Sequence, residues 1–395
     1  MTAESARAFG ALEAQASALL GLFGRAGYEQ VAPSIIQPAD IFLDQIGEAL
    51  RGRTYVFTDL AGEELCLRPD LTVPVSRLYL ERHPGADVPA RYCYNGPAFR
   101  FQPKGPSATH PREFRQAGKI GRASCRERVQ DRETADEEVV RLAVEGVRGA
   151  GLEDFSLRFG DISLFYALLD ALALPERWRL KLEHYFWRPP AFHALLARLA
   201  RGERPEHVGP AAELAATLDP EDPARAEEIV ADYLESKGLP LAGNRSPAEI
   251  AGRLIDLAKD LRAEPLRKEV AAVIDYYLAV DAPPREAVER IAMIAKGAGL
   301  DLGPQLDLVA RRFERLGENA IDLGSARFAT GFGRDLEYYS GMVFQIEVAR
   351  DDLGPIAGGG RYDRLLTSLG AKREVPAVGA AIHTERLLVA TEGAR

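Results

Sequence analysis

The hydrophobic pattern of the chain predicts strands and helices in its first part. An amphipathic helix is predicted within residues 1–27, where apolar residues recur at helical spacing: Phe9, Leu12, Ala16, Leu19 and Phe23. A second helical stretch is predicted over 71–82. Short runs with strand character lie around it, at 27–36, 55–57, 65–67, 91–94, 98–101 and 113–116.

Glycine and proline refine this first part. Gly62 supplies turn freedom between two of the runs, so residues 55–68 are predicted to form a hairpin. Pro33 cannot donate a ladder hydrogen bond, which suits an edge or an interface rather than a central strand. A loop rich in proline, glycine and serine is predicted over 103–111.

From about residue 163 to 318 the apolar residues keep helical spacing throughout, and prolines fall between the runs. This block is therefore predicted to be all helical. Strand character returns over 326–348, Gly358–Gly360 is predicted to form a turn before a helix at 361–369, and 376–389 is predicted to be a strand leading into a last helix.

The pattern indicates an α+β fold in which an antiparallel sheet is flanked by helices. Both ends of the chain build this sheet, so we expect a core made of residues 1–162 and 325–395, interrupted by an all-helical insertion at 163–324.

One segment departs from the pattern. Residues 120–129 should continue a strand after Gln116, but they lack apolar alternation and carry three arginines. They resemble one reading frame of a common DNA-sequencing adapter, and we interpret them as a cloning or assembly artefact. Cys125, which lies in this segment, is given no functional meaning.

Composition narrows the class of protein. Hydrophobic residues make up 46% and charged residues 28% of 395 residues, which is typical of a globular protein with two domains. A formal charge of −9 disfavours general nucleic-acid binding, although a local basic groove stays possible. Cys66, Cys93 and Cys125 are far apart, which argues against a disulfide framework or a local zinc site. With no apolar leader and no run of membrane-spanning length, the sequence predicts a cytoplasmic protein.

Candidate chemistry lies where charged residues stand beside glycines in strand-like surroundings. Arginine on a strand is suited to hold a carboxylate or phosphate, and an acid such as Asp70 can hold an ammonium group. Together these residues indicate a pocket for an α-amino acid. The alternative is that they form structural ion pairs on the sheet. The clusters lie at 67–72, 99–101 with 111–116, and 333–341 with 358–363.

The order of these clusters resembles the catalytic domain of histidyl-tRNA synthetase, which has a class II synthetase fold. The resemblance covers most of residues 8–120 and 325–390. It rests on several motifs in a fixed order: Gly27-Tyr28 with Pro33, Arg68-Pro69-Asp70-Leu71-Thr72, Phe99-Arg100, Arg112-Glu113-Phe114-Arg115-Gln116, Arg334 with Tyr338-Tyr339-Ser340-Gly341, Gly358-Gly359-Gly360-Arg361-Tyr362-Asp363, and Pro376-Ala377-Val378-Gly379 with Glu385-Arg386-Leu387.

The resemblance implies a role for each matching residue. Asp70, Thr72 and Gln116 take the positions that contact the amino group of histidine. Tyr338 and Tyr339 take those that line the imidazole side.

Three arginines complete the implied site. Arg100 matches the motif 2 arginine, which touches the amino-acid carboxylate and the α-phosphate of ATP. Arg334 matches the arginine that serves activation, and Arg386 matches the motif 3 arginine that holds ATP.

Departures from the synthetase pattern fall on the nucleotide side. Gln102 replaces a glutamate used for adenine, and His383 replaces a glycine against which adenine packs, so an imidazole is expected to fill the nucleotide slot. The alternative for His383 is an ordinary buried histidine. Ile120 replaces an acid four residues after Gln116. Nine residues follow Arg386, so we expect the anticodon-binding domain of the synthetases to be absent.

A retained amino-acid pocket with a damaged nucleotide site resembles the family of ATP phosphoribosyltransferase regulatory subunits. The resemblance implies a non-catalytic chain, without cofactor, metal, tRNA or membrane. It also implies a short-form catalytic phosphoribosyltransferase as partner, free histidine as ligand, and a homodimer core formed through motif 1 and Pro33. Two alternatives stay open: a truncated histidyl-tRNA synthetase-like enzyme that still adenylates an amino acid, and a module that binds another metabolite.

Overall fold

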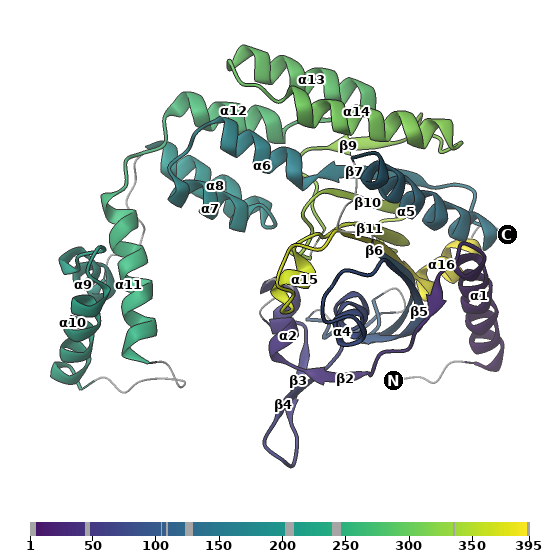
Figure 1. Ribbon diagram of the computed structural model, residues 1–395, viewed down its shortest axis with the longest axis horizontal. Helices are drawn as coiled ribbons and strands as arrows, with labels where there is room; N and C mark the ends of the chain where they lie inside the picture. The colour runs from purple at the N-terminus through teal and green to yellow at the C-terminus, as the bar shows by residue number, and fades with distance from the viewer. Residues whose placement is uncertain are drawn as a thin grey trace. The chain divides into compact units, whose positions relative to one another are not determined.

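The computed structural model describes residues 5–43, 48–103, 105–107, 110–122, 129–201, 209–238, 246–334 and 336–392. The chain forms two compact units, of which the larger joins Met1–Trp187 to Asp275–Arg395 and the smaller is Arg188–Ile274 (Figure 1). No helix among these described stretches is long and apolar enough to cross a bilayer.

A nine-stranded sheet forms the centre of the larger unit, in the order β1-β5-β6-β12-β11-β10-β7-β9-β8. The pairs β1–β5 and β7–β9 are parallel and the remaining pairs are antiparallel. Its strands are β1 Glu29–Gln30, β5 Ala90–Phe99, β6 Glu113–Arg122, β7 Ser156–Asp161, β8 Asp281–Ala282, β9 Arg327–Ala329, β10 Met342–Glu347, β11 Ala357–Arg361 and β12 Ala377–His383. The predicted α+β fold is confirmed.

Pairing of β6 with β12 joins the two halves of the core. Gln116 lies opposite His383, and Gly118 lies opposite Ala381. Residues separated by more than 260 positions in the sequence are thereby neighbours on one sheet.

The turn predicted at Gly358–Gly360 is wrong, because these glycines lie in β11 at the middle of the sheet. A Cβ on Gly359 would lie 2.1 Å from the carbonyl oxygen of Gly379, and one on Gly360 would lie 2.3 Å from that of Met342. The glycines therefore let neighbouring chains approach closely, which local composition cannot distinguish from turn freedom.

The two short strands predicted at 91–94 and 98–101 are one strand, β5. Ile120 and Gly121, which the sequence pattern set aside, continue β6 and pair with both β5 and β12. Arg122 is the last residue of this strand and Val129 is the first of the helix that follows, whereas residues 123–128, including Cys125, lie outside the described residues.

A second sheet has three strands in the order β2-β4-β3, with bounds Ile36–Pro38, Glu64–Leu67 and Tyr55–Thr58. The predicted hairpin is confirmed, and Gly62 adopts a φ of 88° at its turn. The strand predicted over 27–36 is instead divided between β1 and β2, and Pro33 lies between them.

Helices cover the larger sheet. The predicted first helix is confirmed as α1, Ala6–Arg25, whose Ser5 side chain accepts a hydrogen bond from the backbone nitrogen of Ala8. Its buried Leu12, Leu19 and Phe23 are each worth about 1.5–3 kcal/mol of burial. α1 packs against α5 (Val129–Gly149), α16 (Thr384–Glu392) and β5 (Figure 1).

The remaining helices of the larger unit are mostly short. The predicted helix at 71–82 is confirmed as α4, and the helix predicted at 361–369 is shortened to α15. The bounds are α2 Asp40–Leu43, α3 Glu48–Arg51, α4 Thr72–Arg82, α6 Ile162–Ala171, α7 Glu176–Tyr185, α13 Pro284–Gly297, α14 Gly303–Glu318 and α15 Leu365–Ser368.

The smaller unit is narrower than the expected insertion at 163–324. Helices α6 and α14 pack onto the larger unit, and β8 adds a strand to its sheet, so the block is not all helical. The smaller unit contains α8 Pro189–Arg201, α9 Pro210–Thr217, α10 Pro223–Ser236, α11 Pro247–Arg262 and most of α12 Lys268–Leu278. A cluster of buried residues that includes Leu218, Val230 and Ile255 packs α9, α10 and α11 together.

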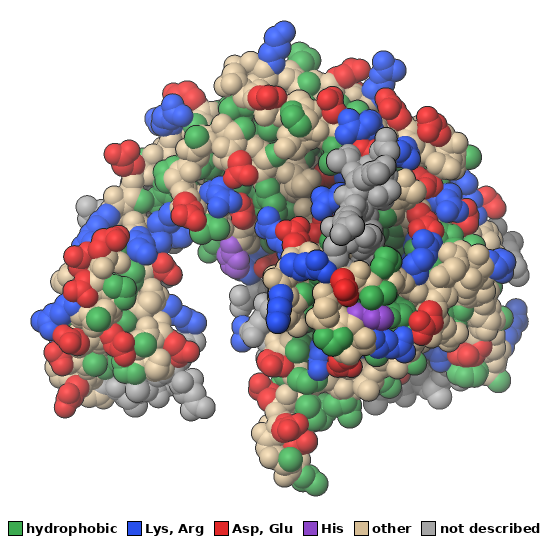
Figure 2. Space-filling view, in the orientation of Figure 1, with side chains coloured by type: hydrophobic (Ala, Val, Ile, Leu, Met, Phe, Trp, Pro, Cys, Tyr) green, Lys and Arg blue, Asp and Glu red, His purple; other side chains and the backbone are tan. Residues whose placement is uncertain are grey.

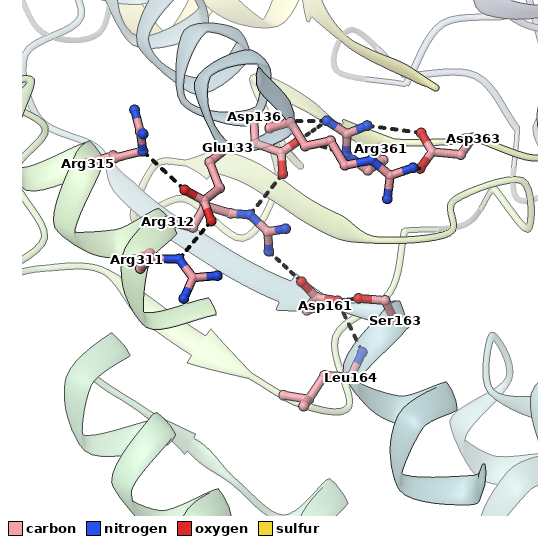
Figure 3. A network of polar contacts seen from close by, with 11 residues as sticks. Glu133, Asp136, Asp161, Ser163, Leu164, Arg311, Arg312, Arg315, Arg361 and Asp363 are labelled. Carbon is pink, nitrogen blue, oxygen red and sulfur yellow. Dashed lines mark hydrogen bonds and ion pairs between the residues drawn. The ribbon is translucent and has the colours of Figure 1, made fainter. Parts of the chain in front are cut away.

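A buried network of charges ties α14 and α5 to the sheet (Figure 3). Arg312 of α14 contacts Asp136 of α5 at 2.8 Å and Asp161, at the end of β7, at 2.6 Å. Arg361 of β11 contacts Asp136 at 2.9 Å and Asp363 at 3.0 Å. Each charge in this network has an opposite partner, as burial of ions requires.

Replacing Arg312 with alanine is expected to lower the free energy of unfolding by about 3 kcal/mol, the lower end of the cost of breaking a buried ion pair. Asp136 keeps Arg361, and Asp161 keeps the backbone nitrogen of Leu164. Urea unfolding monitored by circular dichroism measures the effect. The matched variant Arg311→Ala should cost roughly 1 kcal/mol or less, because that side chain is half exposed and Glu133 keeps Arg315. Equal losses in the two variants would contradict this account.

Candidate ligand-binding site

A cavity of about 370 Å³ lies in the larger unit, against β6, β10, β11 and β12. The structure brings all ten residues singled out from the sequence to its lining: Asp70, Thr72, Arg100, Gln102, Gln116, Arg334, Tyr338, Tyr339, His383 and Arg386. Their convergence depends on the β6–β12 pairing and on the turn that precedes α4. What the cavity binds stays a prediction at this point.

Asp70 is the buried acid of the cavity. One carboxylate oxygen accepts a hydrogen bond from the backbone nitrogen of Val73, and the other accepts one from the hydroxyl of Tyr338, both at 3.3 Å. Burial raises the pKa of this carboxyl, and the guanidinium of Arg100 partly opposes the rise. An ammonium group placed beside Asp70 would favour its charged form.

Gln116 presents a buried acceptor to the cavity. Its side chain is 5% exposed, and its Oε1 has no hydrogen-bond partner among the residues that the structure describes. A buried amide oxygen without a partner is costly, so a donor on a ligand would satisfy it.

The guanidinium groups of Arg100, Arg334 and Arg386, together with that of Arg53, make the other part of the cavity positive. Arg100 donates to the carbonyl oxygen of Pro69 at 2.9 Å, and Arg386 donates to that of Pro355, also at 2.9 Å. Burial, and after it the nearby charges of Arg100 and Arg334, lower the pKa of Arg386 to about 10. A carboxylate or phosphate is the ligand group that this arrangement attracts.

The position of Arg334 explains a glycine whose role the sequence analysis missed. A Cβ on Gly358 would lie 1.4 Å from Nη1 of Arg334, so the guanidinium lies directly over the backbone of β11. Nη1 donates to the carbonyl oxygen of Phe344 at 3.4 Å. The absent side chain at Gly358 is therefore a requirement of the site.

Tyrosines enclose the deep side of the cavity. The ring centroids of Tyr338 and Tyr339 are 4.8 Å apart, and Tyr362 lies 5.5 Å from Tyr338 and 6.1 Å from Tyr339. Tyr362 is a lining residue that received no role from the sequence, although it stands in the Gly-Gly-Gly-Arg-Tyr-Asp motif. Ile120, where the resemblance expects an acid, is buried in β6 opposite Gly379.

His383 and Gln102 are held by neighbours within the cavity lining. The His383 ring packs on the Phe114 ring at 5.1 Å, and the Arg100 guanidinium lies 5.0 Å from the same Phe114 ring. Gln102 accepts from Arg53 at 2.7 Å and donates to the carbonyl oxygen of Pro111 at 3.0 Å. Arg53 and Phe114 are lining residues to which the sequence analysis gave no role. Phe114 stands in the motif that ends at Gln116, whereas no pattern in the sequence pointed to Arg53.

Burial holds the pKa of His383 well below its usual range, and the charges of Arg386, Arg100 and Arg334 act in the same direction. The imidazole is therefore neutral in the folded protein. Among the described residues, no group of three or more His, Cys, Asp or Glu is placed to hold a metal ion.

Comparison with known proteins first defines the class of protein to which this chain belongs. The sequence profile of the histidyl-tRNA synthetase family matches residues 5–229 and 255–387. Two solved structures share the fold. One, described as an ATP phosphoribosyltransferase regulatory subunit/histidyl-tRNA synthetase from Bacillus halodurans, has a TM-score of 0.66 at 18% identity, over 99% of this chain and 81% of that one. The other, a histidine–tRNA ligase subunit from Alicyclobacillus acidocaldarius, has a TM-score of 0.60 at 22% identity, over 100% and 96%.

Sequence relatives narrow this class. A protein of Mesorhizobium japonicum named ATP phosphoribosyltransferase regulatory subunit is 37% identical over 376 residues, 94% of this chain and 96% of the relative. A Sinorhizobium medicae protein of the same name is 37% identical over 372 residues, 93% and 95% of the two chains. The chain belongs to the family of ATP phosphoribosyltransferase regulatory subunits, which have the histidyl-tRNA synthetase fold.

The neutral state of His383 predicts a pH dependence of stability. Below pH 6.5 His383 binds a proton in the unfolded chain but not in the folded protein. The free energy of unfolding therefore falls as the pH falls, by up to about 1.4 kcal/mol per pH unit. His383→Gln should lose this part of the slope in urea unfolding between pH 7.5 and 5. The control His184→Gln, at an exposed histidine of α7, should keep the wild-type slope. Parallel curves for His383→Gln and wild type would refute the assignment.

Proposed function

We propose that this chain is the non-catalytic regulatory subunit of an ATP phosphoribosyltransferase. In this role it is required for the first step of L-histidine biosynthesis, and its cavity binds free histidine and mediates feedback inhibition. The observation that carries the proposal is the joint presence, in one cavity, of a buried acid, an amide oxygen without a partner among the described residues, and four guanidinium groups. The names of the relatives support the assignment to a phosphoribosyltransferase.

A free amino acid matches this cavity in charge. Its ammonium group suits Asp70 and the Oε1 of Gln116, and its carboxylate suits the guanidinium groups of Arg100 and Arg334. The rings of Tyr338 and Tyr339 then enclose the side chain. A volume of about 370 Å³ falls within the range of small-molecule sites.

Loss of adenylation is the second part of the proposal. The buried His383 ring packs on Phe114, and Gln102 stands where the synthetases have a glutamate that contacts adenine. A ring in this position reduces the room for a purine base. The catalytic chemistry is assigned to a partner, because the relatives are named regulatory subunits of an ATP phosphoribosyltransferase. We propose that this partner is the short-form catalytic subunit.

The alternative is a histidyl-tRNA synthetase-like enzyme that still adenylates an amino acid. The observation in its favour is that Arg100, Arg334 and Arg386 all line the cavity. Histidine-dependent exchange of pyrophosphate into ATP separates the two functions, since only an adenylating enzyme catalyses it. Exchange above the rate of a denatured control would make this chain an enzyme.

A homodimer core is proposed through the three-stranded sheet and its surroundings. Large apolar side chains are exposed there: Ile35, Ile36, Val56, Phe57, Leu60 and Phe101. Apolar side chains are visible on the hairpin that projects at the bottom of Figure 2. Exposed apolar patches of this kind mark protein interfaces. Light scattering of the purified chain tests the dimer, and a monomer mass at micromolar concentration would contradict it.

The assembly is placed in the cytoplasm, which agrees with two buried free thiols, Cys66 and Cys93. Fractionation of the source cells tests this placement. A secreted or periplasmic protein would contradict it.

Co-expression with a short-form catalytic phosphoribosyltransferase is the experiment that tests the function. The two chains should purify together, and the rate of phosphoribosyl transfer to ATP should rise when this chain is added. Histidine should then inhibit the complex, with a coupling of about 1–3 kcal/mol between the histidine site and the substrate site. A catalytic subunit with the same rate alone and in the mixture would reject the regulatory role.

Histidine binding depends on Asp70 in this proposal. Asp70→Asn should weaken the affinity for histidine in calorimetry by about tenfold or more, because the hydrogen bond to a charged partner is lost. The control Asp87→Asn makes the same chemical change at an exposed loop position and should bind as the wild type does. Equal affinity in Asp70→Asn and Asp87→Asn would exclude the carboxylate from the site.

A further inference from the structure

The segment Thr330–Arg334 carries Arg334 into the cavity and has little room to move. Phe332, Gly333 and Arg334 all line the cavity. A Cβ on Gly333 would lie 3.0 Å from the ring of Trp187, and one on Gly331 would lie 3.3 Å from the carbonyl oxygen of Leu278. Both glycines are therefore pressed against parts of the chain far away in sequence.

The contact between Gly333 and Trp187 lies where the chain enters the smaller unit. Trp187 is the last residue of the larger unit before Arg188 begins the smaller one. The neighbouring Phe186 also approaches Gly333, and its ring packs on Phe165 of α6 at 4.6 Å. Trp187 is thus anchored on the larger unit while its backbone continues into the smaller one.

The contact between Gly331 and Leu278 lies close to the place where the chain returns to the larger unit. Helix α12 crosses the division between Ile274 and Asp275 without a break. Its last turn holds the segment, because the hydroxyl of Thr330 donates to the carbonyl oxygen of Tyr277. Just beyond the helix, the carbonyl oxygen of Val280 accepts from the backbone nitrogen of Thr330 at 3.0 Å.

We propose that Thr330–Arg334 is a coupling segment, through which the smaller unit and the ligand cavity influence each other, and that Trp187 is a positioning residue for Arg334. The identity of the ligand as histidine rests on the proposed function above. The coupling itself rests on the two places where the chain passes between the units, after Trp187 and after Ile274. Residues next to both places contact the segment Thr330–Arg334.

The coupling follows from stiffness and close packing. A continuous helix transmits a displacement along its length, so a movement of Lys268–Ile274 displaces Tyr277 and the hydrogen bonds on Thr330. Because Gly333 has no side chain that could change its conformation when Trp187 shifts, the backbone before Arg334 must move with Trp187. Linkage is reciprocal: a ligand that fixes Arg334 must equally restrict Trp187 and the end of α12.

Histidine titration of tryptophan variants tests this proposal. Trp187→Ala should weaken histidine affinity roughly fivefold or more, within the range of couplings between sites. Trp187→Phe keeps a ring against Gly333 and should bind nearly as the wild type does. The control Trp178→Ala removes the other tryptophan, which is buried in α7, and should reduce stability while leaving the affinity unchanged. Unchanged affinity in Trp187→Ala, or an equal loss in Trp178→Ala, would overturn the proposal.

A ligand-free measurement keeps this test separate from that of the proposed function. Amide hydrogen exchange should be faster across 330–334 in Trp187→Ala than in wild type, and unchanged there in Trp187→Phe and Trp178→Ala. If wild type binds no histidine but this exchange pattern holds, the proposed ligand is wrong and the coupling segment stands. If exchange at 330–334 is the same in all four proteins, the coupling segment is rejected whatever the cavity binds.

Discussion

The antiparallel pairing of β6 with β12 is the interaction on which the rest of the molecule depends. It places Gln116 opposite His383, and it closes a sheet whose two halves are contributed by opposite ends of the chain. Helix α16 follows β12 directly and carries Arg386 to the cavity. Without this pairing, the lining residues of β6 and those of β12 and α16 would not meet at one cavity.

The cavity presents both a buried acid and a group of arginines, so each charge of a zwitterion has a partner of opposite sign there. The Asp70 carboxyl has its pKa raised by burial, while Arg386 has its pKa lowered by burial and by the charges of Arg100 and Arg334. In both groups burial makes the charged form less favourable. An ammonium beside Asp70 and a carboxylate among the arginines would relieve both, which is the physical basis for proposing a free amino acid as ligand.

Rigid surroundings give this cavity its connection to the rest of the protein. Arg361 lies on β11 three residues after Gly358, and it joins the ion pairs that hold α5 and α14. On another side, Gly333 meets Trp187 at the division between the two units. A regulatory subunit needs such connections, because a ligand site that moved independently could not alter a partner.

Local signals in the sequence were sufficient for α1, for the hairpin at Gly62 and for the strand and helix that end the chain, since each depends on periodicity or turn chemistry within a few residues. The order of the motifs in the sequence was sufficient to single out ten residues that line one cavity in the structure. The tertiary structure alone decided that Gly358 makes room for Arg334, that Tyr362 lines the cavity, that β8 joins the sheet and that the smaller unit begins after Trp187. Each of these depends on close approach between segments distant in sequence, and neither spacing nor composition records such distances.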